Sequence, residues 1–189
     1  MINNNVQIEK TLEYLIRGNV ILYPTDTVWG LGCDATSEEA VLKIFDIKKR
    51  NESKSLVLLV DGLEMLKNYV KDIPDNLEFV LKAAKKTTTI IYKNPIGLAK
   101  NVVAKDNTVA IRIVKNEFCQ ELIKQFGKPI VSTSANISKK PTPKSFKEID
   151  PSILDAVDYV VNLYHDKITN TPSRIIKFDK DGSVKVIRD

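Results

Sequence analysis

The chain of 189 residues has few of the side chains that metal binding and proton relays need, with one histidine, His165, and two cysteines, Cys33 and Cys119. One imidazole cannot form a histidine metal cluster, and it gives a serine–histidine relay little to draw on. Two cysteines without a spacing pattern favour free thiols in a reducing cytoplasm. We therefore interpret His165 as a surface residue and Cys33 as a packed thiol rather than a nucleophile.

Long apolar runs and the common nucleotide-binding motifs are also missing. The longest apolar candidates, such as residues 56–60, have the length of a strand, whereas a helix needs ~20 apolar residues to cross a bilayer. Residues 1–5 lack the charged and apolar regions of a secretory signal. Neither G-x-x-x-x-G-K-[ST] nor G-x-G-x-x-G occurs. We expect a soluble, cytoplasmic protein without a membrane partner.

Charge is present in both signs, with 29 basic and 24 acidic side chains and a net charge of +5. The local surplus lies in two clusters, which are Lys48, Lys49, Arg50 and Lys54, and Lys139, Lys140, Lys144 and Lys147. A solvated face is the plain interpretation of such clusters, and an anionic partner is the alternative. Neither cluster is interleaved with the aromatic residues of a platform for single-stranded nucleic acid.

Hydrophobic patterns alternate between strand and helix along the whole chain, so we expect one α/β domain over residues 1–189 with a mixed, twisted sheet. Expected strands span residues 20–23, 55–60, 87–92, 108–114, 129–131, 158–161, 173–178 and 183–187. Expected helices span residues 6–17, 37–48, 74–85 and 116–126, with a further one opening near residue 61. Ser37 is a candidate N-cap, and Asp61 with Glu64, like Ser145 with Glu148, matches a capping box.

Three polar segments stand at the ends of these elements, where ligands gather in α/β sheets. Residues 24–27 read Pro-Thr-Asp-Thr, residues 48–50 read Lys-Lys-Arg, and residues 132–136 read Ser-Thr-Ser-Ala-Asn. Hydroxyl-rich turns and cations at a helix C-terminus are sufficient structural reasons for each segment taken alone. However, a lysine with an arginine also grips a polyphosphate, and hydroxyl and amide groups bind small polar ligands. No single segment decides between these interpretations.

Taken in order, the segments resemble the YrdC/TsaC family, the threonylcarbamoyl-AMP synthases. The resemblance covers roughly residues 12–188, and its motifs lie at residues 23–35, 48–50, 109–112, 127–138 and 172–176. It implies a YrdC-like α/β fold, in which a twisted mixed sheet is flanked by helices and forms a concave, positively charged groove. Because no long C-terminal extension follows, we expect the short, single-domain form.

The resemblance also implies an enzyme, a nucleotidyltransferase that condenses L-threonine, bicarbonate and ATP into threonylcarbamoyl-AMP and pyrophosphate. Mg²⁺ would accompany the phosphates of ATP, with no protein ligand assigned to it. The product serves the threonylcarbamoyl modification of adenosine in tRNA. Expected partners therefore include the proteins that transfer this group, and tRNA or double-stranded RNA in the groove.

The family's functional positions map onto particular residues of this chain. The Lys-x-Arg and Ser-x-Asn tetrad corresponds to Lys48, Arg50, Ser134 and Asn136 as catalytic residues. The positions that hold threonine correspond to Thr25, Arg112, Ser134 and Ser173. Nucleotide contacts correspond to Thr108 and Arg188, together with Lys48, Arg50 and Asn136.

The chain departs from the family pattern at three places. Asn51 and Ser55 replace usual prolines, residues 85–89 replace a Pro-Gly-Pro-Leu-Thr type segment, and Lys139 stands at a usual glycine. Two other readings stay open, an RNA-binding module of the same fold without synthase activity and a paralogue that makes no adenylate. The intact tetrad argues against the paralogue.

Overall fold

The computed structural model describes residues 4–50, 56–168, 171–179 and 181–189. The strands in these ranges are β1 (Ile21–Tyr23), β2 (Gly30–Gly32), β3 (Val57–Val60), β4 (Thr88–Lys93), β5 (Thr108–Ile113), β6 (Ile130–Ser134), β7 (Tyr159–Val160), β8 (Arg174–Phe178) and β9 (Val184–Arg188). The helices are α1 (Asn4–Ile16), α2 (Glu38–Lys48), α3 (Leu63–Tyr69), α4 (Leu77–Ala83), α5 (Glu117–Phe126) and α6 (Pro151–Leu154), with 3₁₀ turns η1 (Lys100–Val102) and η2 (Phe146–Glu148).

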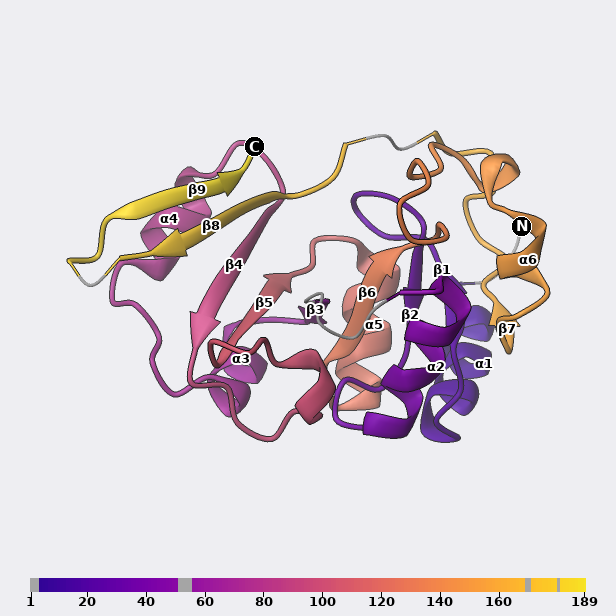
Figure 1. Ribbon diagram of the computed structural model, residues 1–189, viewed down its shortest axis with the longest axis horizontal. Coiled ribbons are helices and arrows are strands. Elements are labelled where there is room, and N and C mark those ends of the chain that lie inside the picture. The colour runs from indigo at the N-terminus through magenta and orange to yellow at the C-terminus, as the bar shows by residue number, and fades with distance from the viewer. Residues whose placement is uncertain (1–3, 51–55, 169–170, 180) are drawn as a thin grey trace.

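The described strands form one mixed sheet in the order β7-β1-β2-β6-β3-β5-β4-β8-β9 (Figure 1). The pairs β1/β7, β3/β5 and β4/β8 are parallel, and the other neighbours are antiparallel. The prediction of an α/β fold with a mixed sheet is therefore confirmed. No helix in the described ranges has both the length and the apolar composition needed to cross a bilayer.

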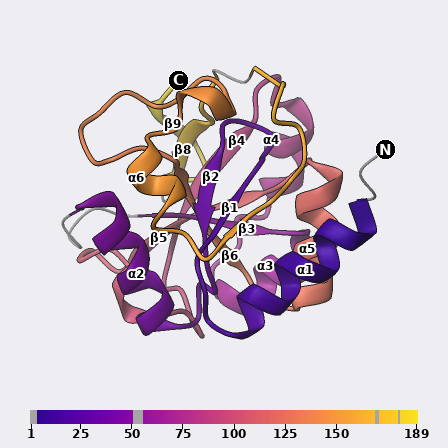
Figure 2. The ribbon, with the colours of Figure 1, turned by 90° about the vertical axis from the view of Figure 1, so that its right-hand side faces the viewer.

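Both faces of the sheet are covered, because successive strand residues point to opposite sides. In β3, Leu58 and Val60 join the core beneath α2, whereas Leu59 joins the core beneath α1 and α5. Figure 2 shows α2 on one side of the sheet and α1 with α5 on the other. This is why the central strands read as continuous apolar runs in the sequence.

Some helix ends have the caps predicted from the sequence, and others do not. Ser37 caps α2 by accepting a hydrogen bond from the Ala40 N–H, as predicted. The prediction of two capping boxes is wrong. Gly62, not Asp61, is the N-cap of α3, and the carboxylate of Glu148 accepts from the N–H of Lys144 rather than from that of Ser145.

Several predicted boundaries also differ from the structure. The glycine-rich strand β2 was not expected, and β6 continues through the hydroxyl-rich segment to Ser134. Helix α4 begins at Leu77 rather than at Pro74, and Pro151 opens α6. The predictions that concern Asn51, Lys54 and Ser55 lie outside the described residues.

Candidate active site

A cavity of about 230 Å³ opens where the β1–β2 loop, the end of β6 and the two ends of the β8–β9 hairpin meet. Its polar lining includes Thr27, Arg50, Arg112, Ser134, Ser173 and Arg188. Three guanidinium groups border this small volume, and none of the described residues that line it is acidic. Such a volume suits a ligand that carries several negative charges.

Lys48 joins the end of α2 to the turn after β6. Its side chain is 1% exposed, and its ammonium donates hydrogen bonds to the main-chain oxygens of Ser134 and, at 2.7 Å, Asn136. The Ser134 hydroxyl in turn donates to Oδ1 of Asn136 at 2.6 Å. Three members of the predicted tetrad are thus in contact, and the lysine fixes the turn that carries the other two.

Arg50 lies two residues beyond the end of α2 and lines the cavity with Ser134. Its Nη1 is 3.5 Å from the hydroxyl of Thr133 on β6. Burial lowers the pKa of Arg50, and burial together with the charge of Arg50 lowers the pKa of Lys48 to about 7. A guanidinium at the edge of a partly dry cavity favours an anionic ligand.

Ser173 and Arg188 form the wall on the side of β8 and β9. Arg188 donates to the main-chain oxygen of Ser173 at 2.7 Å, and the Ser173 hydroxyl is 2.7 Å from the hydroxyl of Thr89 on β4. Ser173 and Thr89 are both buried, so this serine has a fixed orientation. The role of Thr89 could not be deduced from the sequence, because the segment before it departs from the family pattern.

Arg112 reaches the cavity from β5 and carries a buried carboxylate behind it. Its Nη2 lies 3.0 Å from Oδ1 of Asp26, and the two side chains are only 4% and 10% exposed. Asp26 belongs to the loop between β1 and β2, 86 residues before Arg112. The family resemblance predicts Arg112 at the site but gives no partner for Asp26.

Four predicted site residues, which are Lys48, Asn136, Thr25 and Thr108, do not line this cavity. The Thr25 hydroxyl donates to the carbonyl of Val28 at 2.7 Å and accepts from the N–H of Thr27 at 3.0 Å, so it stabilises its own turn. Thr27 lines the cavity in its place. Thr108 starts β5, four residues before Arg112, and its hydroxyl donates to Asp106 at 2.6 Å.

The segment after Asn136 is held against the β1–β2 region by aromatic packing. The ring of Phe146 stacks on that of His165 with centroids 3.9 Å apart, and both contact Trp29. The expectation of a surface histidine is therefore wrong in part, because His165 is half-buried. Since Thr142 also lines the cavity, this packing helps to place one of its walls.

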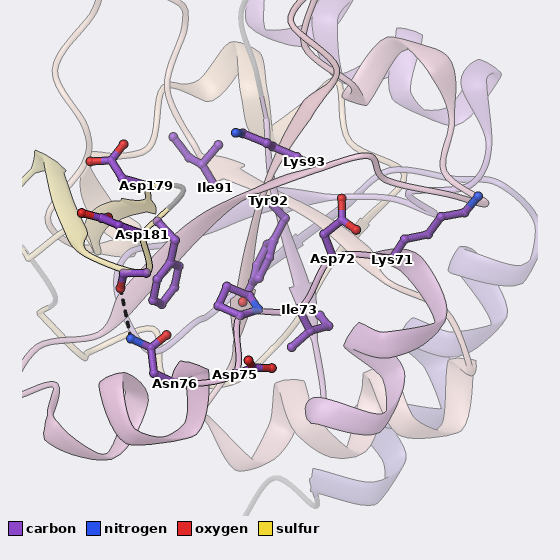
Figure 3. A pocket seen from close by; sticks show the side chains of 13 residues that line it. Lys71, Asp72, Ile73, Asp75, Asn76, Ile91, Tyr92, Lys93, Asp179 and Asp181 are labelled. Carbon is purple, nitrogen blue, oxygen red and sulfur yellow. Dashed lines mark hydrogen bonds between the residues drawn. The ribbon is translucent and has the colours of Figure 1, made fainter.

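A larger groove, of about 750 Å³, lies between β4, the loop before α4 and the β8–β9 turn. Figure 3 shows its acidic side chains at different ends, with Asp75 well apart from Asp179. No group of three or more His, Cys, Asp or Glu in the described part of the chain could hold a metal ion. None of the predicted site residues lines this groove, so the smaller cavity is the candidate site.

The chain also matches a known protein family. The family model Sua5/yciO/yrdC, described as "Telomere recombination", matches residues 13–189. The chain belongs to this family.

Curated members of the Sua5/yciO/yrdC family give the match more detail. A threonylcarbamoyl-AMP synthase from Xanthomonas campestris pv. campestris is 34% identical over 159 residues, which is 82% of this chain and 84% of the relative. One from Pseudoalteromonas translucida is 32% identical over 169 residues, with the same two coverages of 82% and 84%. The predicted resemblance is confirmed.

Solved structures of the Sua5/yciO/yrdC family share the fold. Sua5 of P. abyssi, complexed with L-threonine, has a TM-score of 0.88 at 26% identity, covering 100% of this chain and 55% of that one. The chain thus spans about half the length of that Sua5. YciO of E. coli has a TM-score of 0.83 over 99% of this chain and 90% of its own, and at 23% identity it shows the fold alone.

Proposed function

We propose that this chain is a threonylcarbamoyl-AMP synthase, a nucleotidyltransferase that condenses L-threonine, bicarbonate and ATP and releases pyrophosphate. The observation that carries the proposal is the meeting of Arg50, Arg112 and Arg188 with Ser134, whose hydroxyl is held by Asn136, at one cavity. A carboxylate and a triphosphate are the anionic groups that these three arginines suit. The curated relatives named threonylcarbamoyl-AMP synthase support the same reaction.

Each side chain takes a part that its position allows. Arg112 pairs with the carboxylate of threonine, and the fixed hydroxyl of Ser173 binds beside it. Arg50 and Arg188 bind the phosphates and neutralise the charge that develops on the leaving pyrophosphate. Ser134 orients the reacting groups, Asn136 fixes the Ser134 hydroxyl by accepting its hydrogen bond, and Lys48 holds the turn that carries both rather than reaching the phosphates. Thr25 contributes by shaping the turn that presents Thr27.

The chemistry needs positioning and charge stabilisation more than a proton relay. The amine of threonine captures CO₂ or bicarbonate, and the resulting carbamate attacks the α-phosphorus while pyrophosphate leaves. Holding the carbamate in line with the leaving group accounts for much of the rate. A site with arginines and hydroxyls supplies these needs, so a single histidine that does not line the cavity is no obstacle.

Mg²⁺, tRNA and the proteins that receive the adenylate are part of the same proposal. The described cavity lining offers cations and hydroxyls, so the ligands of Mg²⁺ would be phosphate oxygens and water. Bound there, the ion neutralises phosphate charge. Double-stranded RNA or tRNA would bind along a positively charged groove. The two buried cysteines that form no disulfide, Cys33 and Cys119, are compatible with a reducing cytoplasm.

The decisive experiment measures pyrophosphate after incubation with ATP, L-threonine and bicarbonate. We expect release that depends on threonine, and we expect Arg50→Ala to remove most of it while the fold remains intact. Arg17→Ala, at an exposed residue after α1, is the matched control. Near-normal turnover of Arg50→Ala contradicts its role. RNA binding with a steep salt dependence and no pyrophosphate would favour a binding module instead.

A further inference from the structure

The three arginines of the cavity differ in what lies behind them. Arg112 has the carboxylate of Asp26 at 3.0 Å, whereas Arg188 donates to the main-chain oxygen of Ser173. In the described part of the chain no carboxylate forms an ion pair with Arg188. A guanidinium with a buried carboxylate beside it presents a smaller net charge to a ligand.

We propose that Asp26 is a positioning residue that reserves Arg112 for the single carboxylate of the amino acid and keeps polyphosphate away from it. The inference rests on the proposed function, in which Arg112 binds threonine. It adds to that function a reason why two anionic substrates do not exchange places in one arginine-lined cavity.

The geometry of the pair supports the positioning role. The Nε and Nη2 atoms of Arg112 are buried and make no hydrogen bond with any described residue, and Nη2 is the atom that faces Asp26. This arrangement leaves Nη1 as the nitrogen that can meet a ligand. Asp26 is itself held from the far side, because the N–H of Lys115 donates to its Oδ2 at 3.4 Å. The ion pair therefore places the guanidinium between Asp26 and the cavity.

The electrostatics of the pair support the selective role. Burying a guanidinium without a partner is unfavourable, so Asp26 stabilises Arg112 in a place that is 4% exposed. The same carboxylate repels any further anion, and the repulsion grows with the charge of that anion. A carboxylate with one negative charge is therefore accepted more readily than a phosphate chain with several, which is discrimination by unfavourable contacts.

The test is calorimetric titration of L-threonine into the protein without ATP, with and without inorganic pyrophosphate as a competing anion. For the wild type, we expect pyrophosphate to change the dissociation constant of threonine by no more than about twofold. For Asp26→Asn, we expect about tenfold weaker threonine binding, because Arg112 loses the partner that positions it. We also expect clear competition by pyrophosphate, because the repulsion by the carboxylate is lost.

A matched control removes another buried carboxylate. Asp34 pairs with Lys128 at 2.8 Å and is also 10% exposed, but its partner Lys128, unlike Arg112, does not line the cavity. Asp34→Asn should bind threonine like the wild type and remain insensitive to pyrophosphate. If Asp34→Asn reproduces the effects of Asp26→Asn, the effect is general destabilisation and the proposal is wrong.

A second variant keeps the proposal testable if Asp26→Asn does not fold. Asp26→Glu retains the charge and displaces it by one methylene, so threonine binding should weaken about threefold while pyrophosphate still fails to compete. Unchanged threonine affinity in either variant, or no competition in Asp26→Asn, overturns the proposal. A wild type that binds no threonine overturns the proposed function as well, so the two failures are distinguishable.

Discussion

The ammonium of Lys48 donates a hydrogen bond to the main-chain oxygen of Asn136, 2.7 Å away and 88 residues further along the chain. It donates to the carbonyl of Ser134 as well, and the carbonyl of Lys48 accepts from the N–H of Ser138 at 2.8 Å. The end of α2 and the turn after β6 are thus one unit. The lysine contributes to the site by holding main-chain groups.

We predict that Lys48→Met lowers threonine-dependent pyrophosphate release by about a hundredfold, because the Ser134–Asn136 turn loses the donor that fixes it. The apolar side chain fits a buried position, so the thermal unfolding midpoint should change little. Lys43→Met is the control, since Lys43 lies on the same helix and also donates to a main-chain oxygen, that of Gly18 at 3.0 Å. Turnover of Lys48→Met within about threefold of the wild type would contradict the anchoring role.

The same lysine predicts a pH dependence of stability. Burial lowers its pKa from 10.5 to about 7, so above pH 7 the folded chain releases a proton that the unfolded chain keeps. Folded stability therefore rises with pH, and it falls again as the pH drops towards 7. Between about pH 7 and 8.5 the gain is roughly 1.5 kcal/mol.

Urea unfolding of the wild type and of Lys48→Met measures this gain as a difference between the two proteins. The comparison stops near pH 8.5 because burial raises the pKa of the Cys33 and Cys119 thiols, which lowers stability at higher pH. A difference between the proteins that stays constant over the range would show that Lys48 does not titrate there.

Local signals predicted much of the fold, and tertiary contacts account for the rest. Ser37 and Asn116 cap α2 and α5 because each side chain meets an N–H within its own turn. The strand β2 escaped prediction because two of its three residues, Gly30 and Gly32, have low strand propensity. Its place in the sheet depends on close approach by neighbours that are distant in sequence.

At the site as well, the sequence predicted the residues but not their tertiary contacts. Resemblance located Arg50, Arg112, Ser134, Ser173 and Arg188, and the structure brings them to one cavity. The pairing of Arg112 with a buried carboxylate and of Ser173 with a strand hydroxyl could not be predicted, because each partner lies more than 80 residues away. The turning of the Thr25 hydroxyl into its own loop depends on backbone geometry that composition does not encode.

Lys139 stands where the family usually has glycine, and it adopts a left-handed conformation with φ of +70°. A lysine in this conformation is strained, so we predict that Lys139→Gly raises the free energy of unfolding by about 0.5–1 kcal/mol. Pyrophosphate release should not fall. Urea unfolding measures the change.

The control for that variant is Lys105→Gly, at an exposed turn without a positive φ. There the added freedom of the unfolded chain should lower the free energy of unfolding by about 0.5 kcal/mol. Equal effects of the two substitutions would mean that the conformation of Lys139 carries no strain.

Gly32 is the glycine where the structure leaves no room for a side chain. A Cβ at this position would lie 2.6 Å from the ring of Tyr23 and 2.9 Å from the carbonyl oxygen of Val131. Tyr23 is fully buried and donates to that same carbonyl at 3.2 Å, so neither neighbour can move cheaply. We predict that Gly32→Ala lowers the free energy of unfolding by about 2–3 kcal/mol through overpacking.

The matched control is Gly62→Ala, because a Cβ at Gly62 meets no heavy atom within 4 Å and its backbone is extended, with φ of −170°. Because alanine is a poorer N-cap than glycine, the free energy of unfolding of this variant should fall by up to about 1 kcal/mol, clearly less than for Gly32→Ala. Gly32 pairs with Ile21 of β1. Two residues earlier in β2, Gly30 pairs with Ser134, where the turn of the site begins. Gly32→Ala should therefore also lower pyrophosphate release at temperatures where the variant is still folded, and full activity there would show that β2 does not position Ser134.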